Sequence, residues 1–296
     1  MPRFRSSRSQ ASHAVTQKIA LGKGRHENRD DGLIHSVGTA RGYEQALKSF
    51  VDYIQNRRLG DLFCVTVEVV KQYLSERAAI VTQKTLDLDR QAIQMHYGMH
   101  LDVIKSKRKT QLSSRRYTPE QVARIAGAQS RKNKLATQIA YNAGLRAHEL
   151  LTIRPVSERQ ASDHREWSIN RFYGRQGVIY TVKGKGGLIR EVILKEELAI
   201  QLEANRLAKP RNVTDRGVHY VQFYDLGGGR TWSQSFTSAS KRELGFSVGA
   251  HGLRHSYVQE RMRELQNKGM LYNDAKGVVA QEVGHFDRKT TGGYLR

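Results

Sequence analysis

The sequence predicts a mainly helical protein of two domains, the second of which also carries a small antiparallel β-sheet. Three observations support this fold class. Apolar residues recur at helical spacing over much of the 296-residue chain. Short β-branched runs between glycine turns interrupt this spacing at residues 167–194. A basic segment at residues 105–116 separates an N-terminal helical region from the remainder, and the chain is long enough for two domains.

The composition indicates a nucleic-acid partner. Lys and Arg total 50 against 28 Asp and Glu, which gives a net charge of +22. Folded proteins rarely carry such an excess without a polyanionic partner, and each phosphate contact releases counterions. A membrane surface is the weaker alternative, because the chain lacks an apolar span of about 20 residues. Cys64 is the single cysteine, which excludes an internal disulfide and fits a reducing cytoplasm, with the protein associated with the nucleoid.

Residues 1–35 are basic and contain few apolar anchors. We expect a flexible N-terminal arm, which either binds accessory DNA or is a solvated tail without a role. Its cations are Arg3, Arg5, Arg8, Lys18, Lys23, Arg25 and Arg29.

Residues 36–104 predict a small all-helical domain. Thr39 is expected to cap a first helix, whose apolar residues recur at helical spacing up to Ile54. Thr66 starts a second helix, and a third runs from about Gln83. Together these helices would bury one shared apolar face.

Residues 105–116 form a basic linker in which six of twelve residues are cationic and none is acidic. Its position between two domains favours contact with a phosphate backbone over the alternative of a merely solvated surface. The candidate DNA contacts in this linker are Lys105, Lys107, Arg108, Lys109, Arg115 and Arg116.

The second domain covers residues 117–296. It begins with a helix capped by Thr118, with Pro119 in the first turn and Gln121 completing a capping box. A helical pattern continues from about Arg131 and is interrupted near Gly144. Short strands are expected at residues 167–170, 177–182 and 190–194, and the pattern from residue 198 onward is mainly helical.

Arg146 is the first candidate for phosphate binding. It follows Gly144, where the chain can turn sharply, and its planar guanidinium suits phosphate oxygens. Glu149 lies three residues further on and could hold the guanidinium from the same face. An ordinary surface ion pair is the alternative for these two residues.

Lys185 lies in a glycine-rich turn between two predicted strands. A lysine on such a hairpin can reach into a cleft and protonate a leaving 5′ oxygen. Lys183 could take this role in place of Lys185, and it is a further candidate DNA contact. The alternative for both residues is a lysine that is merely exposed on the hairpin.

Four candidates lie near the C-terminal end. His251 and Arg254 are three residues apart and would share one side of a helix, so that Arg254 supplies a second phosphate clamp. His251 would donate to a non-bridging oxygen or assist proton transfer, whereas the adjacent His255 is interpreted as a packing residue. His285 would contact a phosphate oxygen or position Tyr294, the candidate nucleophile.

Taken in order, these residues supply what cleavage of a phosphodiester requires without a metal: cations around the transition state and a tyrosine that attacks phosphorus. No cofactor or metal is expected, because the candidate site has only one carboxylate, Glu149, and no histidine-rich metal motif occurs. The Gly227-Gly228-Gly229-Arg230 run lacks the lysine of a phosphate loop and is interpreted as a flexible turn.

These motifs resemble those of the tyrosine recombinases, which include phage-type integrases and chromosome-dimer resolvases. The resemblance covers about residues 115–296: Gly144-Leu145-Arg146 with Glu149, Gly184-Lys185-Gly186 with Arg190, His251-Gly252-Leu253-Arg254-His255, and Gly284-His285 with Tyr294. It implies a helical core-binding domain in residues 36–104 and a catalytic domain in residues 117–296, which close around duplex DNA as a clamp.

The resemblance also implies an activity. Tyr294 would attack a phosphate within a specific recombination site, form a 3′-phosphotyrosine, and release a 5′-hydroxyl that later reverses the step. Four protomers would act together on double-stranded DNA, with an accessory DNA-bending protein or directionality factor as a possible partner. Two alternatives stay open: a type IB-like topoisomerase, which relaxes supercoils as a monomer, and a non-enzymatic DNA-binding protein.

Overall fold

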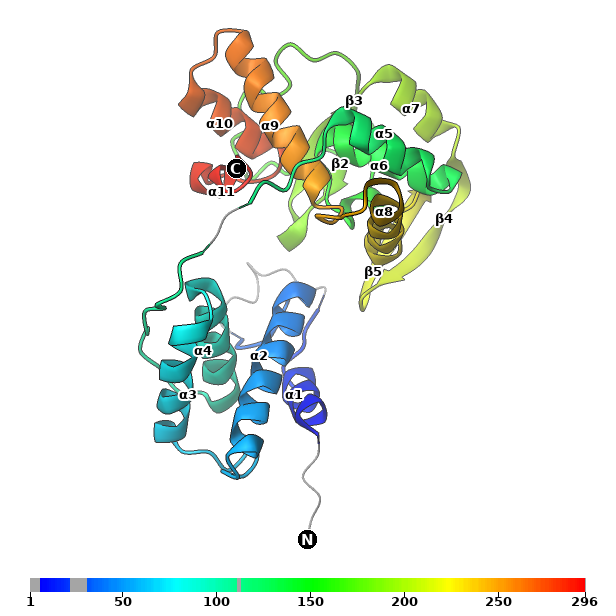
Figure 1. Ribbon diagram of the computed structural model, residues 1–296. Coiled ribbons are helices and arrows are strands. Elements are labelled where there is room, and N and C mark those ends of the chain that lie inside the picture. Colours follow the sequence, from blue (N-terminus) through cyan, green and yellow to red (C-terminus); the bar gives the residue numbers. More distant parts are fainter. Residues whose placement is uncertain (1–5, 22–30, 111–112, 296) are drawn as a thin grey trace. The chain divides into compact units, whose positions relative to one another are not determined.

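A computed structural model describes residues 6–21, 31–110 and 113–295 of the chain. Contacts between residues divide the chain into two compact units, residues 1–112 (unit 1) and residues 113–296 (unit 2). The boundary between the units falls inside the basic segment 105–116. The fold is mainly helical with small antiparallel sheets, as predicted (Figure 1).

Unit 1 is helical throughout its described elements. Its helices are α1 (Ser7–Thr16), α2 (Val37–Asn56), α3 (Val67–Ile80) and α4 (Gln83–Tyr97). The predicted starts after Thr66 and at Gln83 are confirmed. The first predicted start is wrong by three residues, because α2 begins at Val37 after Ser36 rather than after Thr39.

The flexible arm predicted for residues 1–35 is wrong for the part that forms α1. Ser6 caps this helix by accepting a hydrogen bond from the Ser9 backbone N–H. Ala11 and Val15 are buried in the same apolar core as Leu47 of α2. These small apolar residues are few, but at helical spacing they are sufficient to dock one short helix on α2. Residues 1–5 and 22–30 lie outside the described residues.

The first part of the predicted linker is packed on unit 1. The Lys107 N–H donates to the Ala78 carbonyl at 2.8 Å, and the Arg108 Nη1 donates to the Ile80 carbonyl at 2.8 Å. The Ser106 hydroxyl donates to the Val81 carbonyl at 2.5 Å. These bonds satisfy carbonyl groups at the C-terminal end of α3, which have no partner within the helix.

Unit 2 contains the remaining helices. They are α5 (Pro119–Gly127), α6 (Arg131–Ala143), the 3-10 turn η1 (Glu149–Leu151), α7 (Glu196–Glu203), α8 (Gly229–Leu244), α9 (Gly252–Asn267), α10 (Tyr272–Glu282) and α11 (Arg288–Gly292). The capping box at Thr118 and Gln121 is confirmed, with Pro119 in the first turn. Buried residues of α5, α6 and α8 form one core with the sheet, to which Ile139 and Trp232 contribute.

A three-stranded antiparallel sheet joins β1 (Arg154–Pro155), β2 (Val178–Lys183) and β3 (Ile189–Leu194), and the 3-10 turn η2 (Lys185–Gly187) connects β2 to β3. Two of the three predicted strands are therefore confirmed. The strand predicted at residues 167–170 is wrong, because this segment is irregular and ends in a turn. The Ser168 N–H donates to the Gln281 side chain of α10 at 2.6 Å.

A separate two-stranded hairpin joins β4 (Arg206–Asp215) and β5 (Val218–Tyr224) (Figure 1). The expectation of mainly helical structure after residue 198 is wrong here. β4 is exposed over most of its length and lacks an alternation of apolar and polar residues. Its pairing with β5 comes from the tight turn at Arg216-Gly217 instead.

Candidate active site

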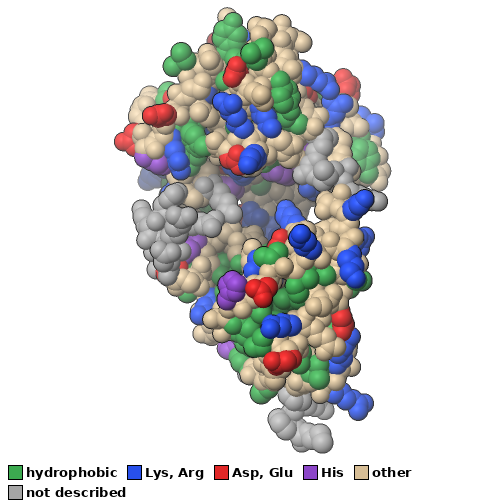
Figure 2. Space-filling model, turned by 90° about the vertical axis from the view of Figure 1, so that its left-hand side faces the viewer, with side chains coloured by type: hydrophobic (Ala, Val, Ile, Leu, Met, Phe, Trp, Pro, Cys, Tyr) green, Lys and Arg blue, Asp and Glu red, His purple; other side chains and the backbone are tan. Residues whose placement is uncertain are grey.

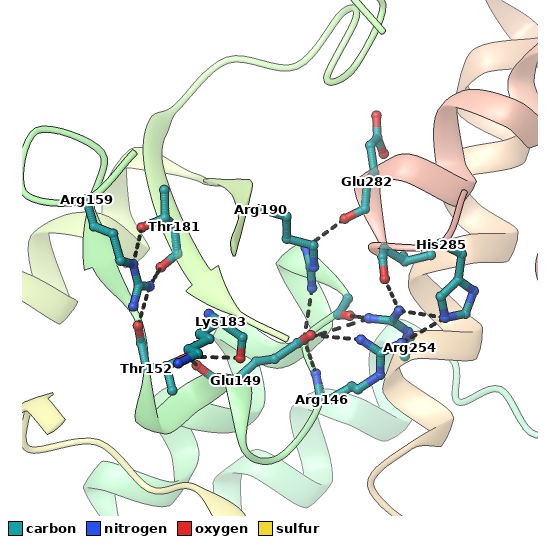
Figure 3. Close-up of polar contacts among 12 residues, drawn as sticks. Arg146, Glu149, Thr152, Arg159, Thr181, Lys183, Arg190, Arg254, Glu282 and His285 are labelled. Carbon is teal, nitrogen blue, oxygen red and sulfur yellow. Dashed lines mark hydrogen bonds and ion pairs between the residues drawn. The ribbon is translucent and has the colours of Figure 1, made fainter. Parts of the chain in front are cut away.

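Three arginines converge on one carboxylate in unit 2 (Figure 3). The Arg146 Nη1 donates to Glu149 Oε1 at 2.9 Å, and the Arg190 Nη2 donates to Glu149 Oε2 at 2.9 Å. The Arg254 Nη1 lies 3.8 Å from the same Oε2. The Glu149 side chain is fully buried. The alternative of an ordinary surface ion pair is therefore wrong for Arg146 and Glu149.

The end of α6 brings Arg146 and Glu149 together. The helix ends at Gly144, which has a φ of 61°, and a Cβ there would lie 2.7 Å from the Tyr257 ring. Only glycine fits this left-handed, closely packed position. The chain then turns so that the Arg146 N–H donates to Glu149 Oε2 at 2.7 Å, and Glu149 begins η1.

The cluster carries an excess of positive charge. Burial alone would raise the pKa of Glu149, but Arg190, Arg146 and Arg254 hold that pKa far below its usual value. Burial, and then the neighbouring Arg146, lower the pKa of Arg254 to about 9, so that its guanidinium is still charged at neutral pH. Three guanidiniums against one carboxylate leave two positive charges. Such a surplus is suited to an anion.

Arg254 projects from the first turn of α9 into the buried interior. Its Nη1 donates to the Gly144 carbonyl at 2.7 Å, and its Nη2 donates to the Val283 carbonyl. His251 occupies the position directly before α9. The His251 ring lies 5.6 Å and the Arg254 guanidinium 5.7 Å from the centroid of the Tyr294 ring. These two candidates therefore lie beside the same ring.

His285 reaches the cluster from the turn after α10. Gly284, with a φ of 71°, reverses the chain, and His285 N–H donates to the Ala280 carbonyl at 2.7 Å. The Arg146 Nη2 donates to His285 Nε2 at 2.7 Å. Partial burial, followed by Arg254 and Arg146, lowers the pKa of His285 to about 3. The imidazole is therefore neutral at pH 7, with the accepting Nε2 unprotonated.

Tyr294 lies against three histidines. The centroid of its ring is 4.7 Å from that of His255, 5.6 Å from that of His251 and 5.7 Å from that of His285. Its side chain is mostly buried, and its carbonyl accepts a hydrogen bond from Gln259 at 2.8 Å. Partial burial and the neighbouring Arg254 lower the pKa of His251 to about 4. The imidazoles of His251 and His285 beside the tyrosine are therefore neutral at neutral pH.

The turn that carries Lys185 begins beside Glu149. A Cβ at Gly184 would lie 3.3 Å from Glu149 Oε1 and 3.9 Å from Arg146 Nη1. The Thr152 hydroxyl donates to the Glu149 carbonyl at 2.9 Å and accepts from the Lys183 N–H at 2.9 Å (Figure 3). The backbone of this turn is thus tied to the cluster. The side chain of Lys185 lies outside the described part of the structure, and Lys183 is exposed.

Three residues of this site were not predicted to belong to it: Arg190, Glu282 and His255. Arg190 was noted only as part of a motif, and Glu282 was not considered. The Arg190 Nη1 donates to the Glu282 carbonyl at 2.7 Å, and the Glu282 carboxylate accepts from Tyr257 and Arg261. An arginine within the apolar run of β3 is the one signal that could have identified a buried cation. His255, interpreted as a packing residue, is buried as expected but also faces Tyr294.

The predicted DNA contacts of the linker are all exposed cations. Lys105, Lys107, Arg108 and Lys109 belong to unit 1, whereas Arg115 and Arg116 belong to unit 2. Lys and Arg side chains are spread over both units on the face shown in Figure 2. Among the described residues, no three His, Cys, Asp or Glu side chains gather as metal ligands would. Likewise, no helix in this part of the chain is long and apolar enough to cross a membrane.

Solved structures of DNA recombinases share this fold. XerH site-specific recombinase bound to its palindromic difH substrate, in a post-cleavage complex, is similar with a TM-score of 0.55 at 16% identity, over 100% of this chain and 94% of that one. A lambda integrase tetramer bound to a Holliday junction is similar with a TM-score of 0.54 at 15% identity, over 96% of this chain and 77% of that one. Comparison with protein-family models and with curated proteins gave no match.

Proposed function

We propose that this chain is a tyrosine recombinase, a site-specific enzyme that cuts and rejoins duplex DNA through a phosphotyrosine intermediate. One observation carries the proposal: a surplus of two positive charges, set by three arginines around Glu149, lies beside a tyrosine and three histidines. The shared fold with XerH recombinase and lambda integrase supports it. The motifs in unit 2 have the order that this family requires.

In the proposed first step, the Tyr294 oxygen attacks the scissile phosphorus and the bond to the 5′ oxygen breaks. His251 is neutral and lies next to the Tyr294 ring, so it accepts the hydroxyl proton. Lys185 donates a proton to the leaving 5′ oxygen. Arg146 and Arg254 stabilise the charge on the non-bridging oxygens, and His285 holds the Arg146 guanidinium toward them.

The second step reverses the first with a different strand. A 5′-hydroxyl from a partner duplex attacks the 3′-phosphotyrosine, and Tyr294 leaves with its proton restored. The covalent bond conserves the energy of the broken linkage, so rejoining requires no ATP. We propose that a homotetramer on double-stranded DNA carries out the exchange in the cytoplasm, with the exposed cations of residues 105–116 lying on phosphates.

Covalent trapping tests this proposal. Nicked suicide substrates, cut from the DNA that flanks the protein's own gene, would be incubated with wild type and with Tyr294→Phe and separated on denaturing gels. A slow-migrating protein–DNA adduct is expected with wild type alone. Arg146→Ala and Arg254→Ala should bind DNA but lose the adduct, since each removes a phosphate clamp worth about 3–4 kcal/mol in the transition state.

Three outcomes would contradict the proposal. An adduct with Tyr294→Phe would exclude Tyr294 as the nucleophile. Relaxation of supercoiled plasmid by a monomer, without site-selective cleavage, would favour a topoisomerase. DNA binding that is unchanged in every variant, with no adduct on any substrate, would favour a non-enzymatic DNA-binding protein.

A further inference from the structure

The turn of the β4–β5 hairpin contains an arginine in an unfavourable conformation. Arg216 has a φ of 51° and Gly217 a φ of 78°, so both central residues of this two-residue turn are left-handed. Asn-Gly and Gly-Gly are the usual choices for such a turn, because a Cβ atom in this conformation crowds the following carbonyl oxygen, a cost that glycine avoids and Asn offsets by a local hydrogen bond. Residues held in sparsely populated conformations gather at functional sites.

A buried aspartate holds the Arg216 side chain in place. Asp215 Oδ2 accepts from Arg216 Nε at 3.0 Å and from Nη2 at 2.9 Å. The other oxygen, Oδ1, accepts from the Arg230 N–H in the first turn of α8 at 2.9 Å. The Arg216 Nη1 has no hydrogen-bond partner among the described residues, and the side chain is 31% exposed. The arginine is therefore fixed on one side and open on the other.

The glycine run before α8 attaches this turn to the catalytic loop. Residues 227–229 are buried, and a Cβ at Gly228 would lie 2.5 Å from Leu151 of η1. The Gly229 N–H donates to the Ala147 carbonyl at 2.8 Å, and a Cβ at Gly229 would lie 2.7 Å from the Asp215 carboxyl carbon. The interpretation of this run as a flexible turn is wrong, because its glycines allow close packing of three segments.

His148 lies between the hairpin and the arginine cluster. Its ring centroid is 6.4 Å from that of Tyr220 on β5, and it precedes Glu149 directly. Burial lowers the pKa of His148, and Arg146, Arg216 and Arg254 lower it further, against the opposing effect of Glu149. Arg216 of the hairpin and two arginines of the cluster are thus all close enough to His148 to affect its pKa.

We propose that Arg216 is a further DNA-binding residue, which contacts a backbone phosphate next to the scissile one. The inference rests on the proposed function. Successive phosphates of one strand rise by about 3.4 Å along the duplex axis, so DNA seated on Arg146 carries neighbouring phosphates past the adjoining loop. The Arg216 guanidinium is held by Asp215 and still has Nη1 available as a donor, so it is suited to bind such a phosphate.

The test exchanges Arg216 for two neutral residues that the turn accepts, Arg216→Asn and Arg216→Gly. The affinity for a short duplex would be measured over a series of salt concentrations. Loss of one phosphate contact should lower the slope of log K against log salt by about 1 and weaken binding at low salt. Arg216→Lys, which keeps the charge, should retain most of the slope. Both neutral variants should melt within about 3 °C of wild type, because relief of backbone strain offsets the lost ion pair.

Lys241 provides a matched control. It is an exposed cation near the C-terminal end of α8, the end opposite to Arg230, and Lys241→Asn should leave the slope unchanged. An unchanged slope in both neutral variants would overturn the role of Arg216, and so would an equal loss in Lys241→Asn. The covalent adduct of wild type is scored in parallel. Its absence would count against the proposed function, whereas an intact adduct with unchanged slopes would count against Arg216 alone.

Discussion

Arg190 and Glu149 form a buried ion pair at the centre of unit 2, with 2.9 Å between Arg190 Nη2 and Glu149 Oε2. The same guanidinium donates through Nη1 to the carbonyl of Glu282, two residues before the turn at Gly284. One arginine of β3 therefore joins the loop of Arg146 to the loop of His285. It touches no reacting atom in the proposed mechanism, so its role is to position the residues that do.

Arg190→Lys should reduce cleavage more than DNA binding. An ammonium group cannot bridge Glu149 and the Glu282 carbonyl in the fixed geometry of a guanidinium. A shift of His285 by about 1 Å would cost on the order of 100-fold in the rate of covalent adduct formation. Single-turnover trapping and duplex affinity would be measured together. Arg211→Lys is the control, because Arg211 pairs with Asp225 and contacts no residue of the cluster, and an equal loss of rate there would contradict a positioning role for Arg190.

Glu149→Gln should destabilise the folded protein strongly. The substitution removes the one negative charge among Arg146, Arg190 and Arg254, and leaves buried cations without a counter-ion. Breaking a buried pair in this way typically costs about 3–5 kcal/mol. Asp225→Asn is the control, because Asp225 forms an exposed pair with Arg211 worth about 0–1 kcal/mol. Urea unfolding measures both, and equal losses would show that Glu149 does not organise the cluster.

Gly284→Ala should be more costly than Gly245→Ala. Both glycines are left-handed, with φ values of 71° and 78°, so each substitution carries a backbone cost of about 1–2 kcal/mol. A Cβ at Gly284 would also lie 2.9 Å from Arg190 Cδ, whereas nothing lies within 4 Å at Gly245. Thermal unfolding should separate the two variants, and Gly284→Ala alone should slow adduct formation. Identical behaviour would indicate that Arg190 can move aside freely.

His285 should make stability depend on pH in the acid range. Its pKa of about 3 in the folded chain lies below the ordinary value of 6.5, so the unfolded chain binds a proton that the folded chain excludes. The free energy of unfolding should therefore be constant above about pH 6.5 and fall as the pH drops from 6.5 toward 3. His285→Gln, which keeps an acceptor for Arg146, should flatten this part of the profile. Parallel profiles for wild type and variant, from thermal unfolding at several pH values, would contradict the assignment.

Local sequence patterns are enough to predict most of the helices, two strands and the candidate residues. Helical spacing and the capping box at Thr118 depend on neighbours within four residues, so α3, α4 and α5 were predictable. The same holds for β2 and β3, whose β-branched runs lie between glycine turns. The order Arg146, Lys185, His251, Arg254, His285 and Tyr294 also predicts the proposed chemistry, which stays a prediction. Exposed β4 carries no such local pattern, and for that reason it was missed.

Which residues come together in the site depends on how the elements pack. Arg190 is separated by 41 residues from Glu149 and by 92 from Glu282, and no local rule specifies either partner. Docking of α1 likewise depends on a complementary apolar face of α2 as well as on its own few apolar residues. A buried guanidinium is stable only where several acceptors converge, and that convergence exists after β3, α6 and α10 have packed. The physical reason is that burial and charge compensation are properties of the assembled interior, whereas helix spacing and caps are properties of the chain.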